Sequence, residues 1–306
     1  MMQTVDMPRV AAVIVTYRNP AMLGRLLGDL CVQTLHLRDI IVVDNSIEDD
    51  TAESIRAGFP QIHYRKMPEN GGSASGFCEG IRIAVTKADY VLTLDDDVRM
   101  LPDAVAMLFA GMKGRLEQGV RVGAVRAVGP SHPAWMPEEL RDFAWRGTLL
   151  SRIAVEMTGL PLRDYFLYAD DLEYSIRMAS AGFRFFWVPA SVIQEMRKED
   201  RSEHRMLGRR FCLYRDDFRI YYALRNQIHA YRVHRRYADL FRTVRYAGKL
   251  MVFLALDKRR GSRRSVEAVW RGMADGFRSR LGKNPCYLPD GDVPGKVLSR
   301  LHKKAV

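Results

Sequence analysis

The sequence predicts an α/β fold with a mostly parallel sheet, helices on both sheet faces, and a basic helical C-terminal region. Short apolar runs alternate with amphipathic stretches in the first hundred residues, and polar side chains follow the runs at their carboxyl ends. Positive charge is concentrated in the last third. Because the 306 residues are 47% hydrophobic, they suffice for two modest domains, which we place at residues 1–205 and 206–306.

The first half has the order expected of a parallel sheet with crossover helices. Continuous apolar runs predict buried strands, and leucines at helical spacing predict the helices between them. The alternation βαβαβαβ is typical of parallel sheets with both faces covered. The expected strands are residues 10–16, 40–43, 62–66 and 90–94, and the expected helices include 21–30 and 52–59.

The second half is less regular. Prolines interrupt residues 120–152, and a helix is expected at 151–158. A further helix ends at Gly182 and leads into a strand at 183–188. Beyond about residue 205 we expect basic, aromatic-rich helices.

Cysteine usage and the absence of long apolar runs bear on location. The four cysteines form no CxxC pair, so we expect free thiols in a reducing compartment. The N-terminus has no apolar signal region, and residues 250–256 are too short to span a bilayer. We therefore expect a cytoplasmic protein, peripheral on the inner face of the membrane.

The charge distribution predicts an anionic partner for the C-terminal third. Residues 201–306 carry 26 Lys and Arg against 9 Asp and Glu, whereas residues 1–200 carry 22 against 27. Candidate partners are a phospholipid surface, a lipid-linked phosphate and nucleic acid. A set of merely solvated basic helices is the alternative. No nucleic-acid-binding motif is present, so no nucleic acid partner is expected.

Residues 231–264 suggest how that third could act. Cations there alternate with apolar side chains, which is typical of a helix lying in a membrane interface. A helical domain that forms a homo-oligomer is the alternative. The apolar positions are Leu240, Phe241, Val244, Leu250, Met251, Phe253 and Leu254.

Three adjacent aspartates at residues 95–97 follow the fourth expected strand. Such a cluster needs a counter-ion, and carboxylate oxygens suit Mg²⁺ or Mn²⁺ bound together with substrate phosphates. Alternation along an extended segment would let Asp95 and Asp97 face one ligand while Asp96 faces elsewhere. The alternative is an acidic N-cap for the following helix.

A second acidic cluster comprises Asp170, Asp171 and Glu173. A carboxylate there could act as general base on a hydroxyl near a metal-bound substrate. Acids favoured by a helix N-terminus are an equally valid interpretation of this cluster alone. The glycines after Asn70 match no GxGxxG pattern, and the chain contains neither GxxxxGK[ST] nor GxSxG.

Five segments carry a family resemblance: VIVTYRNP, VVDNS, NGGSASGF, LTLDDDV and ADDLEYSIR. In this order and spacing they resemble family 2 inverting glycosyltransferases, which have the GT-A fold, over residues 8–230. The resemblance implies a nucleotide-sugar donor and Mn²⁺ or Mg²⁺. It places Thr16, Tyr17, Arg18, Asp44, Asn70, Gly71, Gly72, Asp95 and Asp96 along the donor.

The same resemblance assigns the remaining roles. Asp171 would be the catalytic base, with Asp170 and Glu173 positioning hydroxyl groups. Asp95 and Asp97 would bind the metal, and Trp145 and Gly147 would lie at the acceptor site. A buried core tryptophan is the alternative for Trp145.

One departure concerns the last metal ligand. Relatives present a histidine at the position occupied here by Gln194. The last ligand could be Gln194 itself, Glu195 or His204, which we expect on the next loop.

Within the family, the run DDDV with Arg99, the glycine loop and DDLEY look most like bacterial galactofuranosyltransferases, with rhamnosyltransferases as near neighbours. Both groups share a motif like the segment at 221–226. This implies transfer of galactofuranose from UDP-galactofuranose to a polyprenyl-diphosphate-linked or cell-surface glycan, as in cell-wall or O-antigen polysaccharide synthesis. The alternatives are a dTDP-rhamnose-dependent rhamnosyltransferase, a nucleotidyltransferase and a non-catalytic sugar-nucleotide-binding module.

Overall fold

The computed structural model describes residues 8–289 apart from residues 131, 134, 197–200, 207–208, 215 and 257–261. Only the backbone is described for residues 201–206, 209–213 and 262. Two compact units are present. One comprises residues 1–162 and 174–198, and the other comprises residues 163–173 and 199–306. We expected a single boundary after residue 205, whereas residues 163–173 group with the C-terminal part in the structure.

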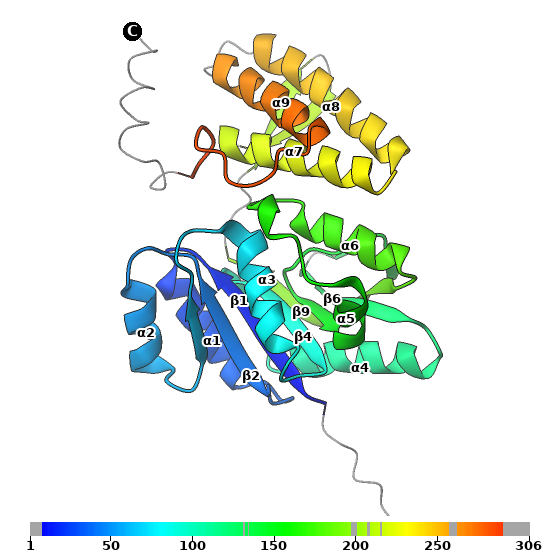
Figure 1. Ribbon diagram of the computed structural model, residues 1–306. Coiled ribbons are helices and arrows are strands. Elements are labelled where there is room, and N and C mark those ends of the chain that lie inside the picture. The colour runs from blue at the N-terminus through cyan, green and yellow to red at the C-terminus, as the bar shows by residue number, and fades with distance from the viewer. Residues whose placement is uncertain are drawn as a thin grey trace, which may run out of the picture. The chain divides into compact units, whose positions relative to one another are not determined.

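The first unit is built on a nine-stranded sheet in the order β3-β2-β1-β4-β8-β6-β9-β5, with β7 paired to β9 (Figure 1). The first four strands are parallel, as predicted from their apolar runs. Later strands add antiparallel pairs, so the sheet is mixed. The strands are β1 (Val10–Thr16), β2 (Asp39–Asp44), β3 (His63–Lys66), β4 (Tyr90–Asp95), β5 (Val98–Met100), β6 (Val122–Val128), β7 (Glu139–Leu140), β8 (Thr148–Ser151) and β9 (Arg184–Glu195).

Helices cover both faces of this sheet, which confirms the predicted fold class (Figure 1). Side chains of β1 alternate between two cores: Ala12 and Ile14 pack in one, and Ala11 and Val13 in the other. The first core includes α1 (Pro20–Cys31), α2 (Asp50–Gly58) and α4 (Ala104–Glu117). The second includes α3 (Gly72–Ala84), α5 (Arg152–Thr158) and part of α6 (Asp170–Ser180).

The C-terminal unit contains three mutually packed helices, α7 (Asp217–Val233), α8 (Tyr237–Leu256) and α9 (Ser262–Phe277). The 3₁₀ helix η1 (Arg163–Tyr165) also belongs to this unit. A hairpin of β10 (Arg201–Met206) and β11 (Arg209–Tyr214) precedes α7. The basic helices were predicted from the sequence, whereas this hairpin was not.

Two glycines allow α9 to approach α7 closely. A Cβ atom at Gly272 would lie 2.8 Å from the Tyr221 carbonyl oxygen, and one at Gly276 would lie 2.5 Å from that of Arg225. Since real Cβ atoms do not approach backbone oxygens so closely, larger residues would push the helices apart. The spacing of four residues places both glycines on one face of α9.

Within the residues described, no helix combines the length and apolar character needed to cross a bilayer. Part of the apolar pattern in α8 faces the helical core instead, because Leu250, Phe253 and Leu254 are buried there. The expectation that these three side chains belong to a membrane-facing surface is therefore wrong in this structure.

Candidate active site

Asp96 connects the loop after β1 to the turn after β4. Its carboxylate is 8% exposed and accepts a hydrogen bond from Thr16 Oγ1 at 2.6 Å and one from Asn19 Nδ2 at 2.9 Å. The Tyr17 backbone amide also donates to it at 3.4 Å. Because a buried carboxylate requires such donors, Asp96 fixes the geometry of this edge of the sheet. Asn19 was not predicted from the sequence as a partner of Asp96.

Asp95 and Asp97 differ from Asp96 in burial. Both are partly exposed, and they lie on either side of the buried residue. We expected an extended chain through this run, but the chain instead turns after Asp95 before β5 begins at Val98. The structure therefore separates one structural carboxylate from two that remain partly accessible to a ligand.

The two accessible carboxylates fit a hard divalent cation that shares its coordination with phosphates. Mg²⁺ is typically held by one or two carboxylates plus substrate oxygens and water. Among the residues that the structure describes, no group of three or more His, Cys, Asp or Glu could hold a metal by itself. A cation held by Asp95 and Asp97 would complete its coordination with oxygens from a bound ligand or from water.

The candidates for a further metal ligand lie on β9 and β10. Strand β5 pairs with the end of β9, so that Val98 faces Glu195 and Arg99 faces Gln194 in register. Glu195 forms an ion pair with Arg146 at 2.8 Å. His204 lies on strand β10 rather than on a loop, and its side chain is outside the described residues.

The loop after β2 is fixed by Asp44, which is fully buried. One carboxylate oxygen accepts a hydrogen bond from the Tyr64 hydroxyl and the other from the Ser46 amide, each at 2.8 Å. Burial and this hydrogen bond to Asp44 raise the pKa of the Tyr64 hydroxyl.

Arg18 is held beside that loop. Its backbone amide donates to Ser46 Oγ at 2.7 Å, and its guanidinium forms a bidentate pair with Glu48 at 2.5 and 3.0 Å. Its φ of 53° is left-handed, which these contacts support.

The glycine loop is tied to the same edge by Asn45. The Asn45 side chain accepts a hydrogen bond from the Gly71 amide at 3.1 Å and donates one to the Gly72 carbonyl at 3.2 Å. Asn70 Oδ1 accepts from the Gly72 amide at 2.9 Å. Asn45 was recognised only as part of a polar strand end, not as the link between two loops.

Trp145 is a core residue in this structure. It is 4% exposed and stacks on Phe77 at 4.9 Å between ring centroids, with Tyr174 at 5.6 Å. Because its ring packs in the core, an acceptor sugar would have to displace core side chains to stack on it. Gly147 is also buried, with a left-handed φ of 70°. The assignment of Trp145 to the acceptor site is therefore corrected to the core interpretation.

The acids at the start of α6 differ in exposure. Asp170 is 3% and Glu173 2% exposed, whereas Asp171 is partly exposed. Glu173 Oε1 lies 2.9 Å from His234 Nε2 on the C-terminal side of α7. Asp171 Oδ1 accepts a hydrogen bond from the Leu172 amide at 2.8 Å. Asp171 is thus the acid of the three best placed to meet a substrate.

The turn before these acids is strained. Phe166, Tyr168 and Ala169 have φ values of 61°, 66° and 58°, in the left-handed region that disfavours residues with a Cβ atom. Each such conformation costs about 1–3 kcal/mol and persists only where the surroundings enforce it. Strain of this kind concentrates at functional sites.

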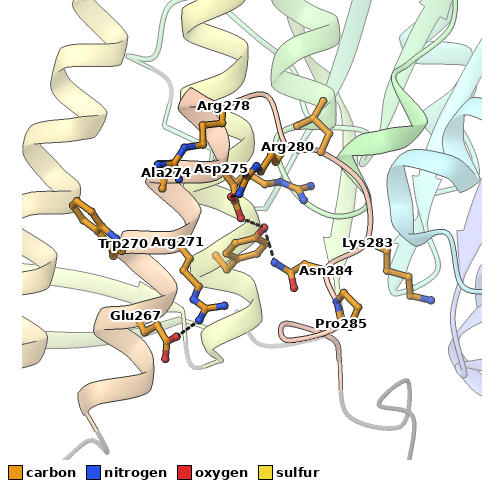
Figure 2. A pocket seen from close by; sticks show the side chains of 13 residues that line it. Glu267, Trp270, Arg271, Ala274, Asp275, Arg278, Arg280, Lys283, Asn284 and Pro285 are labelled. Atoms are coloured by element: carbon orange, nitrogen blue, oxygen red, sulfur yellow. Dashed lines mark hydrogen bonds and ion pairs between the residues drawn. The ribbon is translucent and has the colours of Figure 1, made fainter. Parts of the chain in front are cut away.

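A separate cavity of about 660 Å³ lies in the C-terminal unit (Figure 2). At its wall Arg271 pairs with Glu267, and Asp275 accepts a hydrogen bond from the Tyr221 hydroxyl at 2.8 Å. Asn284 donates to the same hydroxyl at 2.9 Å. None of the site residues expected from the sequence lines this cavity.

The mixed sheet covered by helices, with carboxylates at its strand ends, is the arrangement expected of a GT-A fold. The family model described as glycosyl transferase family 2 matches residues 11–191, more than half of the chain. The chain therefore belongs to glycosyl transferase family 2. No curated protein sequence gives a significant match.

Two solved structures with TM-scores above 0.5 support the fold. The mannosyltransferase PcManGT from Pyrobaculum calidifontis, in complex with GDP-Man and Mn²⁺, is 17% identical with a TM-score of 0.56, over 98% of this chain and 81% of that one. GalNAc-T7 with UDP, GalNAc and Mn²⁺ is 14% identical with a TM-score of 0.52, over 66% and 44%. TarS from S. aureus is 13% identical with a TM-score of 0.48, over 63% and 37%. The match thus covers less than half the length of GalNAc-T7 and of TarS.

His229 gives a prediction of pH-dependent stability. Burial, followed by the charge of Arg232, lowers the pKa of His229 below its ordinary value of 6.5. The unfolded chain then binds more protons below about pH 6.5, so the free energy of unfolding should fall as pH decreases through this value. In urea titrations at pH 7 and pH 5, His229→Gln should lose less stability between the two than the wild type. Equal losses would contradict this.

Proposed function

We propose that the protein is a metal-dependent inverting glycosyltransferase that moves galactofuranose from UDP-galactofuranose to a lipid-linked or cell-surface glycan. The observation that carries the proposal is the aspartate run at residues 95–97, at the carboxyl end of β4 in a family 2 sheet. Ligands of such sheets bind outside the carboxyl ends of the strands. Asp44 and Thr16 end the neighbouring strands β2 and β1 at the same level.

The proposed chemistry is a direct displacement. Asp171 accepts the proton of the acceptor hydroxyl, whose oxygen attacks the anomeric carbon opposite the nucleotide. The new glycosidic bond forms as the bond to the diphosphate breaks, which inverts the configuration. A Mn²⁺ or Mg²⁺ ion held by Asp95 and Asp97 would supply positive charge to the departing diphosphate. Mn²⁺ accompanies the nucleotide or nucleotide sugar in the complexes of PcManGT and GalNAc-T7, which supports this choice.

The choice of sugar rests on the sequence motifs. The run DDDV, the glycine loop and DDLEY favour galactofuranose, and dTDP-rhamnose is the second candidate.

A donor screen tests the proposal. We expect Mn²⁺-dependent thermal stabilisation by UDP-galactofuranose and none by UDP-galactopyranose, UDP-glucose or dTDP-rhamnose. A ligand at about 100 times its Kd adds about 2.7 kcal/mol to the free energy of unfolding, which gives a measurable rise in Tm. Asp97→Asn should abolish the rise, whereas Asp103→Asn, at the N-cap of α4, should retain it because the Asp103 side chain makes no capping hydrogen bond that the change could remove.

The outcomes of this screen separate the sugar from the class. Stabilisation by dTDP-rhamnose alone would reject galactofuranose and retain glycosyl transfer. No response to any nucleotide sugar would contradict the proposed class of activity.

Replacing the base tests the mechanism. Asp171→Asn keeps an oxygen to accept the Leu172 amide but cannot accept a proton at neutral pH. We expect kcat for transfer to fall about 10²–10⁴-fold, the usual contribution of general base catalysis, with little change in donor affinity. The control is Asp164→Asn, an exposed acid on η1. Undiminished turnover in Asp171→Asn would reject the base.

We also propose that α8 attaches the protein to an anionic membrane on the cytoplasmic side, beside a polyprenyl-diphosphate-linked acceptor. An exposed stripe on this helix combines apolar and basic side chains at spacings of three and four residues. Helical spacing places them on one face, away from the buried positions of the same helix. The stripe comprises Phe241, Arg245, Lys249, Val252 and Leu256.

Vesicle binding tests the membrane proposal. The protein should cosediment with phosphatidylglycerol vesicles and much less with phosphatidylcholine vesicles. Arg245→Glu should weaken binding, since each cation near an anionic surface contributes about 1 kcal/mol. Lys113→Glu, on α4 in the other unit, makes the same charge change and should bind normally. Equal weakening by both variants, or equal binding to both lipids, would contradict the role of the stripe.

A further inference from the structure

Helix α7 supplies the contacts that enforce the strained turn before Asp170. Asn226 is fully buried, and its side-chain nitrogen Nδ2 lies within hydrogen-bond distance of three carbonyl oxygens of the turn, which share its two hydrogens. The distances are 2.9 Å to Tyr165, 2.8 Å to Leu167 and 2.8 Å to Tyr168. Phe166 and Ala169 both have left-handed φ values. The Asn226 amide group thus binds the carbonyls on both sides of Phe166 and the carbonyl just before Ala169.

Arg225 determines which way the Asn226 amide faces. Its Nε donates to Asn226 Oδ1 at 2.8 Å, so the oxygen of the amide is engaged and the NH₂ group faces the turn. The same guanidinium donates from Nη2 to the Tyr165 carbonyl at 2.9 Å and from Nη1 to the Gly282 carbonyl at 2.6 Å. At 1% exposure, Arg225 is a fully buried cation with directed donors on each side.

Further contacts from α7 hold both ends of the segment. The Tyr165 hydroxyl lies 2.8 Å from His229 Nδ1, and Glu173 pairs with His234. His229 therefore contacts the start of the segment, Asn226 its centre and His234 its end. The two histidines follow Asn226 by three and eight residues, spacings that fall on one face of a helix.

We propose that Asn226, oriented by Arg225, is a positioning residue for the base Asp171. The hydrogen bonds hold the backbone of residues 165–169 in a conformation that these residues would otherwise leave. Residues 165–169 lead directly into the first turn of α6, so their backbone conformation determines the position of the Asp171 side chain. A displacement of about 1 Å at a reacting group can lower the rate about 10²-fold. The inference rests on the proposed function, since it requires Asp171 to act as the base.

A double-mutant cycle tests this role. Asn226→Ala should lower kcat at least 10-fold while donor KM changes less than threefold. If Asn226 acts through Asp171, then adding Asn226→Ala to Asp171→Asn should change the residual kcat less than twofold. An equal fractional loss in both backgrounds would overturn the proposal, because it would show a role independent of the base. Wild-type kcat in Asn226→Ala would overturn it as well.

Rescue by glycine gives a second measurement. Ala169→Gly removes the Cβ atom that disfavours the left-handed conformation at this position. The turn should then keep its conformation with fewer hydrogen bonds from α7. The double variant Asn226→Ala with Ala169→Gly should have a kcat at least threefold higher than that of Asn226→Ala alone. Because the glycine relieves strain, this double variant can also be assayed if Asn226→Ala alone folds poorly. A failure to recover kcat would contradict the strain-based mechanism.

Hydrogen exchange separates this inference from the proposed function. Amides of residues 166–172 should exchange faster in Asn226→Ala than in the wild type. They should not do so in Ile228→Ala, which removes a buried α7 side chain that makes none of these hydrogen bonds. Wild-type turnover in Asp171→Asn would reject the base but leave this exchange result intact. Unchanged exchange in Asn226→Ala would reject the positioning role whatever the reaction.

Discussion

The parallel pairing of β1 with both β2 and β4 is the constraint on which the site depends. In register, Thr16 lies beside Asp44, and Val15 lies beside Asp95. Since β1 is buried on both faces, a slip by one residue would exchange the side chains of its two cores. The three polar strand ends are thereby brought to one edge, where Asp96 can reach Thr16.

This edge separates carboxylates that stabilise the loops from carboxylates that remain partly accessible. Asp44 and Asp96 are buried, and protein donors engage both oxygens of each carboxylate. Asp95 and Asp97 keep partial exposure. The buried pair gives the neighbouring loops defined conformations, and preorganised loops lower the entropic cost of binding a flexible donor.

The sequence predicted the parts of the structure that depend on local pattern. Apolar runs gave the four parallel strands, and the acids at their ends gave the candidate site. Contacts between distant segments were not accessible in the same way. Trp145 carries no local signal that distinguishes a sugar-stacking ring from one stacked on Phe77. The buried face of α8 was mistaken for a membrane face because hydrophobic spacing reveals an apolar side but not its partner.

The contacts of Asn226 also could not be predicted from local sequence pattern. The segment at 221–226 was recognised as a motif, yet nothing nearby in the sequence indicates that it binds carbonyls about 60 residues upstream. The left-handed turn was equally hidden, since Phe166, Tyr168 and Ala169 are not residues that favour such φ values. A hydrogen-bond network can select a backbone conformation against local preference, and only the folded chain reveals it.

Residues 163–173 group with the C-terminal unit, and this determines where two related chains can be joined to make a hybrid protein. A hybrid joined near residue 205 would take its acids from one parent and Arg225 and Asn226 from the other. Each half could be well folded, and the turn could still meet an α7 that evolved with a different backbone. Recombination that respects the unit would instead transfer residues 163–173 together with everything after residue 198, as one internal and one C-terminal replacement.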